Sequence, residues 1–185
     1  MAGDESKGVS LLREHYQAAI QLLEGTMEGV TPEQAHWVPP GTAHPIGANY
    51  AHVVVGQDLL VNGRLKDGTP LFAGTRAGRT GLNELPPRPD PAKPGFPDWS
   101  RWARQVKIDL GGLRSYAREV YAATDAYLAS LTDADLTRTV DLSALGLGQM
   151  PVKQLLLRAL LGNTLTHCGE ISCLKGLQGS KGYPF

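Results

Sequence analysis

The amino-acid sequence predicts an all-α protein, a four-helix bundle with one long crossover loop between the second and third helices. Apolar residues recur at spacings of three and four along four long segments, as a single buried helical stripe requires. Alternating strand patterns are nearly absent. The connection between the second and third segments is long enough to return the chain to its starting end, so these two helices can run parallel.

Composition limits the kind of protein that this chain can be. Its 185 residues suit a single domain over 1–185, with 42% apolar and 19% charged residues. Eighteen basic residues balance eighteen acidic ones, so the chain lacks the charge expected of a nucleic-acid binder or of a protein on an anionic membrane. The polar, acidic start resembles no signal peptide, and no apolar run is long enough to span a bilayer. We therefore expect a cytoplasmic protein with no nucleic-acid or membrane partner.

The first long helix is expected over about residues 9–28 and the second over about 46–65. Between them, Thr31-Pro32-Glu33-Gln34 has the order of a helix cap, a first-turn proline and a capping-box glutamine, which predicts a short helix. The apolar stripes that define the two long helices are Leu12, Tyr16, Ala19, Ile20 and Leu23 in the first, and Ala48, Ala51, Val55, Leu59 and Leu60 in the second.

The crossover loop spans residues 66–98, where seven of 33 residues are proline and five are glycine, too many for a helix or a strand. Loops of this length inside compact domains are often functional. Arg76 and Arg79 could then clamp an anion, or they are solvated loop charges. Trp99 and Trp102 could wall a pocket, or they anchor the start of the third helix by packing.

The third long helix is expected over about 99–130, with a break at Gly111-Gly112, and the fourth over about 151–175, where Pro151 suits the first turn. Between them a second capping pattern begins at Thr132, and an extended stretch covers 137–142. The apolar stripes are Leu113, Tyr116, Val120, Ala123, Tyr127 and Leu128 in the third, and Leu155, Leu156, Ala159, Leu160, Ile171 and Leu174 in the fourth.

Two histidines, His52 and His167, share the apolar faces of the second and fourth helices, so we expect both to point into the bundle interior. Metal sites in bundles are built from side chains on facing helices. Asn163 lies one turn before His167 on the same face, the spacing of a two-point chelate, although a neutral amide oxygen is a poor ligand for a transition metal. Alternatively, both histidines are hydrogen-bonded core residues without a ligand.

Three further residues are candidates for the surroundings of this site. Glu170, three residues after His167, could hold an imidazole through a hydrogen bond, or it is a surface charge. Tyr50 could orient a substrate or close the core. His15, on the first helix, could join the other histidines, or it lies at the edge of its stripe.

The residues from Trp37 through the Pro-Gly turn to His52, together with Asn163-Thr164-Leu165-Thr166-His167-Cys168-Gly169-Glu170-Ile171, resemble the DinB/YfiT-like superfamily. Its members are four-helix bundles with a long crossover. Their metal site takes one histidine from helix two and two from helix four in an H-x-x-x-H spacing. The resemblance assigns His52 and His167 to two of these ligands. Asn163 stands where the family has a histidine or, in some thiol-dependent members, a glutamate.

The resemblance implies a metal-dependent enzyme that acts on a small molecule. Nickel (Ni²⁺) or zinc (Zn²⁺) would activate a low-molecular-weight thiol for transfer or isomerisation, or water for hydrolysis. The alternative is a non-catalytic ligand-binding or dimerisation module, its metal site degenerate at Asn163. We also expect a homodimer.

Overall fold

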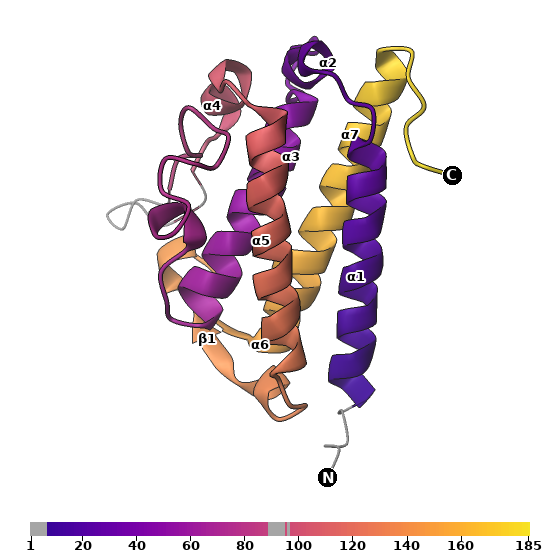
Figure 1. Cartoon of the computed structure of the whole chain (residues 1–185). Coiled ribbons are helices and arrows are strands. Elements are labelled where there is room, and N and C mark those ends of the chain that lie inside the picture. Colours follow the sequence, from indigo (N-terminus) through magenta and orange to yellow (C-terminus); the bar gives the residue numbers. More distant parts are fainter. Residues whose placement is uncertain (1–6, 89–94, 96) are drawn as a thin grey trace.

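The computed structural model describes residues 7–88, 95 and 97–185 and has the architecture of a four-helix bundle (Figure 1). The second and fourth long helices each contain a π-helical segment. The four are α1 (Lys7–Met27), α3 (Ile46–Asp58) with its π-helical continuation Leu59–Leu65, α5 (Leu110–Ala129), and the run of α6 (Val152–Leu155), the π-helical Leu156–Gly162 and α7 (Asn163–Leu177).

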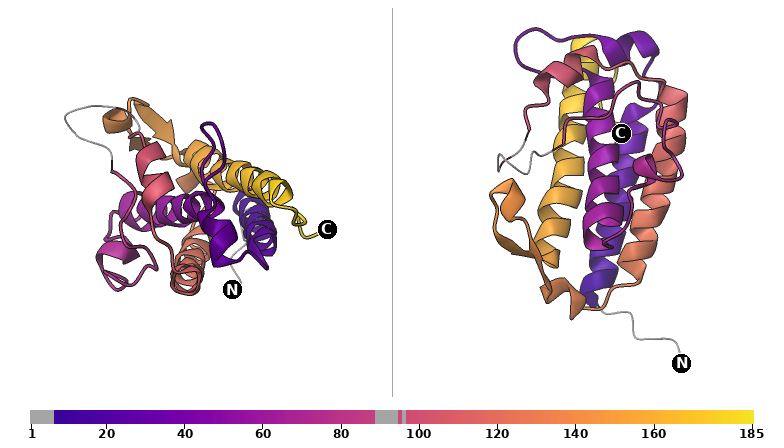
Figure 2. Two further views of the ribbon diagram at one scale, coloured as in Figure 1. Left: turned by 90° about the horizontal axis from the view of Figure 1, so that it is seen from above. Right: turned by 90° about the vertical axis from the view of Figure 1, so that its left-hand side faces the viewer.

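The directions of the long helices follow from the long crossover. α1 and α7 run one way, and α3 and α5 run the other, so the second and third long helices are parallel as predicted (Figures 1 and 2). α3 packs against α5 and α7, and α1 packs against the same two helices. Among the described residues no helix is long and apolar enough to cross a membrane.

The shorter elements lie at the ends of the bundle. α2 (Pro32–His36) has the predicted capping box between Thr31 and Gln34. α4 (Ser100–Gln105) lies against α3 (Figure 2). β1 (Thr139–Asp141) and β2 (Gln149–Pro151) form an antiparallel pair that the sequence did not reveal, because three residues are too few for a recognisable alternation.

The break in the third predicted helix lies earlier than expected. The helix stops at Gln105, an extended stretch follows, and α5 begins at Leu110, so Gly111 and Gly112 lie inside its first turn. The Asp109 side chain caps the new helix by accepting from the Gly111 backbone N–H at 3.0 Å. Ile108, just before it, pairs with Leu82 of the crossover in an isolated β-bridge. The cap and the bridge therefore set the boundary.

A buried carboxylate ties the crossover to the bundle. Asp58 is fully buried at the end of α3 and accepts from the backbone N–H groups of Leu71 and Phe72 at 2.9 and 3.0 Å. It also accepts from the Tyr116 hydroxyl of α5 at 2.6 Å and from Asn62 at 2.8 Å. Four donors satisfy this charge, as a buried ion requires.

The π-helical segment before α7 changes which residues face the core. Its i to i+5 hydrogen bonds give it wider turns, which rotate the following helix by roughly 100° relative to an unbroken α-helix. As a result, Thr164 and Cys168 lie in the core, whereas Asn163 and His167 are only half-buried. His52 is half-buried as well. Both histidines therefore lie where α3 packs against α7, beside the apolar clusters of the core and not within them.

Candidate functional site

His52 of α3 and His167 of α7 meet where these two helices pack together. Their ring centroids are 4.9 Å apart, and the ring planes are inclined at 70°. The two residues are 115 positions apart in the sequence, and only the packing of α3 against α7 brings them together.

Asn163 takes part in the same cluster. It lies one helical turn before His167, and its side chain is near enough to the imidazole of His52 to oppose, in part, the lowering of the pKa of that ring. The amide thus links α7 to the histidine of α3. All three residues that the sequence singled out as metal-ligand candidates lie together.

Glu170 holds the second imidazole in place. Its Oε2 lies 2.7 Å from Nδ1 of His167, and this hydrogen bond lowers the pKa of the Glu170 carboxyl. An ionised carboxylate can only accept, so Nδ1 of His167 is the donor in this contact, and in the neutral ring Nε2 would carry the lone pair. Histidines that bind metals are commonly oriented by a carboxylate in this way.

Aromatic rings cover the cluster. The indole of Trp99 stacks on His52, with ring centroids 4.5 Å apart and an interplanar angle of 18°. The ring of His44 lies 4.2 Å from the Trp99 ring, and His167 meets the indole edge-on at 6.1 Å. Three imidazoles therefore gather around one indole.

Burial keeps His52 uncharged. Desolvation, with a smaller contribution from neighbouring His167, lowers the pKa of His52 to about 4. The ring is neutral at neutral pH, the form in which imidazole binds a metal. Burial also lowers the pKa of His44, an effect that the nearby Glu170 carboxylate opposes.

The sequence model of the DinB superfamily matches residues 15–171. The chain belongs to the DinB superfamily. The crystal structure of a conserved protein from Enterococcus faecalis has a similar fold, with a TM-score of 0.75 over 91% of this chain and 95% of that one. At 19% identity this likeness concerns the fold alone. No curated protein is significantly similar to the chain.

The candidate site of this DinB superfamily chain offers fewer histidine ligands than a site with three imidazoles. Within the described ranges, no group of three or more His, Cys, Asp or Glu side chains could hold a metal ion. The available donors are the nitrogens of His52 and His167 and the amide oxygen of Asn163. Two imidazoles and a neutral oxygen are donor types that a divalent transition metal accepts, and they would hold it less tightly than three imidazoles would.

Two other candidates from the sequence lie apart from this cluster. Tyr50 is fully buried, and its hydroxyl donates to Glu24 of α1 at 2.8 Å. Side chains two residues apart on a helix diverge by roughly 200°, so Tyr50 and His52 point to different sides of α3. His15 is exposed on α1, and its Nδ1 lies 2.9 Å from its own helix, at the Leu11 carbonyl oxygen.

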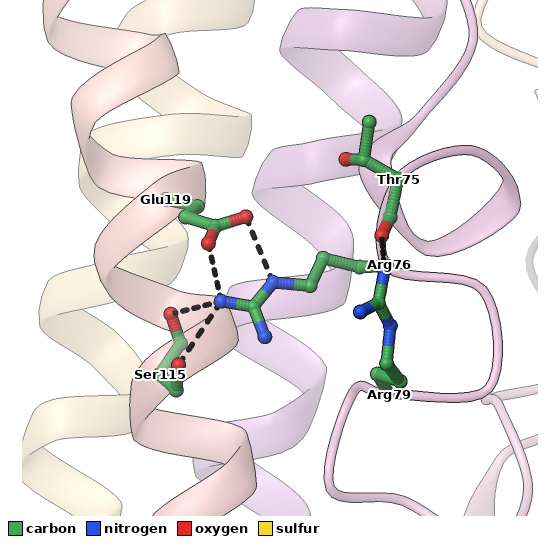
Figure 3. A network of polar contacts seen from close by, with 5 residues as sticks. All are labelled: Thr75, Arg76, Arg79, Ser115 and Glu119. Atoms are coloured by element: carbon green, nitrogen blue, oxygen red, sulfur yellow. Dashed lines mark hydrogen bonds and ion pairs between the residues drawn. The ribbon is translucent and has the colours of Figure 1, made fainter.

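The two arginines of the crossover are engaged elsewhere (Figure 3). Arg76 pairs with Glu119 of α5, its Nε lying 2.8 Å from Oε2, and it also donates to Ser115. Arg79 donates to the Thr75 carbonyl oxygen at 2.6 Å. These contacts tie the loop to α5 and to itself, and neither arginine clamps an anion at the histidine cluster.

No sequence pattern placed His44 at the site, and Trp99 was expected either to wall a pocket or to anchor the start of the third helix. His44 precedes Pro45 and the start of α3, a position typical of a connection. Trp99 is 47 residues beyond His52, on the far side of a proline-rich loop. Only the return of the crossover to the end of the bundle where α3 begins brings Trp99 next to His44 and His52.

Proposed function

We propose that this chain is a metal-dependent enzyme of the DinB superfamily that acts on a small molecule at the cluster of His52 and His167. The observation that carries the proposal is the approach of two imidazoles to 4.9 Å, with the Glu170 carboxylate orienting one of them. In this proposal His52 and His167 hold a nickel or zinc ion, and Asn163 is the third, weaker ligand.

A metal held by neutral ligands keeps its positive charge and lowers the pKa of a bound thiol or water. The chain's own residues prepare the site for that chemistry. Glu170 keeps the proton of His167 on Nδ1, and Asn163 steadies the ring of His52. Trp99 covers the face of His52. The reaction is a transfer or isomerisation that uses a low-molecular-weight thiol, or a hydrolysis.

A second function is favoured by a different observation. The described part of the chain has no third His, Cys, Asp or Glu placed to complete a metal site, and the Asn163 side chain already interacts with the imidazole of His52. A non-catalytic module that binds a small molecule, with a degenerate metal site, would have these features.

Metal content tests the proposal. Untagged protein is soaked in nickel, zinc or manganese, desalted and subjected to elemental analysis. We expect close to one ion per chain in the wild type and loss of that ion in His52→Ala and in His167→Ala. His15→Ala is the matched control, because His15 is exposed on α1 and lies outside the cluster. Equal metal content in the wild type and both cluster variants would contradict the proposal.

Asn163→His separates the two functions. If the wild type is a metalloenzyme, the third imidazole strengthens binding that already exists. If the site is degenerate, the wild type stays empty after soaking, and Asn163→His creates binding where there was none.

A further inference from the structure

The imidazole of His52 needs more than one contact to have a defined orientation. Rotation of a histidine ring about its Cβ–Cγ bond is governed by a broad torsional potential. The polar side chain of Asn163 interacts with the ring, but a single polar contact leaves the tilt of the ring plane open. The residue that restrains the plane is Trp99, since its indole lies nearly parallel to the imidazole, at 18° and 4.5 Å.

Trp99 is held in place by neighbouring aromatic rings. It directly precedes α4, and Trp102 of that helix is buried, with its indole N–H donating to the Glu84 carbonyl oxygen at 3.0 Å. The Trp99 and Trp102 rings are 6.0 Å apart. His44 contacts the Trp99 ring as well, at 4.2 Å. The indole of Trp99 is therefore held by packing against rings on two segments.

The stacked arrangement leaves the nitrogens of the His52 imidazole accessible to a ligand. An indole on the face of a ring does not cover the ring nitrogens, whose lone pair and N–H lie in the ring plane. Any rotation of His52 out of that plane would drive the edge of the imidazole into the indole. Trp99 thus restricts the orientation of His52 without closing it to a ligand.

We propose that Trp99 is a positioning residue of this site, whose stacking on His52 sets the plane of the imidazole. The expected effect of Trp99 on metal binding rests on the proposed function. The effect of Trp99 on the orientation of His52 is independent of any metal.

Nuclear magnetic resonance of the metal-free protein tests the orientation. Nuclear Overhauser contacts from the His52 ring protons to neighbouring side chains report the plane of the imidazole, and the His52→Ala variant identifies its signals. We expect one defined set of contacts in the wild type and in Trp99→Phe, which keeps an aromatic face. Trp99→Leu fills the space without stacking, and we expect its contacts to average over several ring orientations. An unchanged set of contacts to residues other than 99 in Trp99→Leu would overturn the inference.

Calorimetric zinc titration tests the consequence. We expect Trp99→Leu to bind zinc about 10- to 100-fold more weakly than the wild type, the usual effect of losing a residue that orients a ligand. Trp99→Phe should stay within about threefold of the wild type, because stacking is preserved. Trp37→Leu, which removes an indole at the end of α2, is the control for general loosening of the fold.

The outcomes separate the two ideas. Equal zinc affinity in Trp99→Leu and the wild type overturns the positioning role, and so does a loss in Trp99→Phe as large as that in Trp99→Leu. A wild type that binds no zinc contradicts the proposed function, and the Overhauser contacts of the His52 ring then still decide the role of Trp99. Circular dichroism confirms that each variant is folded.

Discussion

The Glu170 carboxylate lies 2.7 Å from Nδ1 of His167, three residues earlier on α7. Glutamine at position 170 keeps an oxygen acceptor but removes the negative charge that makes the imidazole a better electron donor. We therefore expect Glu170→Gln to weaken zinc binding by about tenfold, as measured by competition with a chromogenic chelator. Glu14→Gln, on the exposed side of α1, should bind as the wild type does. An unchanged affinity in Glu170→Gln would mean that the carboxylate has no part in the site.

Asp58 provides a test of how the crossover is held. Asp58→Ala leaves the backbone N–H groups of Leu71 and Phe72 and the Tyr116 hydroxyl without their buried acceptor. We expect a loss of roughly 3–5 kcal/mol in the free energy of unfolding, measured by urea denaturation.

Tyr116→Phe removes only one of these hydrogen bonds and should cost about 1.5–3 kcal/mol, the usual range for a bond to a charged group. If Asp58→Ala were no more destabilising than Tyr116→Phe, the carboxylate would not be the anchor that the geometry indicates.

Two glycines of the crossover form a matched pair. Gly81 and Gly78 both have positive φ, at 79° and 68°. A Cβ at Gly81 would lie 2.3 Å from the backbone nitrogen of Leu113, whereas a Cβ at Gly78 would meet nothing within 4 Å. Gly78→Ala should therefore cost about 1–2 kcal/mol, through backbone strain alone. Gly81→Ala should cost roughly 1–3 kcal/mol more, since the close approach of the loop to α5 is lost as well. Equal thermal stabilities of the two variants would contradict this close approach.

The ion pair between α1 and α5 predicts a pH dependence of stability. Arg13 contacts both oxygens of Asp125, at 2.9 and 2.8 Å, and holds the pKa of that carboxyl below its ordinary value of 3.8. The pKa of Asp125 is lower in the folded state than in the unfolded state. The ion pair therefore stabilises the fold fully at a pH above the unfolded-state pKa, and this stabilisation is lost as the pH falls through the folded-state pKa.

We expect Asp125→Asn to be less stable than the wild type at pH 7, by up to about 1 kcal/mol for a partly exposed pair. The difference should shrink below pH 4. Denaturation curves across this range provide the measurement. Arg13→Met should show the same weakening of the acid dependence, and a difference that persists unchanged at low pH would exclude the ion pair as its cause.

Local sequence patterns were sufficient to predict the four long helices, apart from the position of the break in the third, and to single out His52 and His167 as candidates. Spacings of three and four residues reflect one buried face, and a histidine within such a face is visible without a structure. The π-helical segment at 156–162 left no comparable mark, because a change of hydrogen-bond partner does not alter the residue types. The stacking of Trp99 on His52 depends on the path of a loop of more than thirty residues, which no local periodicity describes.

The π-helical segment also bears on how the site can change between related chains. One π-helical turn holds about one residue more than an α-helical turn, so deleting one residue between 156 and 162 would let that stretch return to α-helical winding and would leave the faces of α7 where they are. A return to α-helical winding without a deletion would instead turn α7 by roughly 100°, so that His167 would move toward the interior and Cys168 would leave it. The match between length and winding in this stretch therefore decides which side chains of α7 face α3. Two relatives with the same residue types at 163 and 167 and the same length here, but different winding, would present those residues to different neighbours.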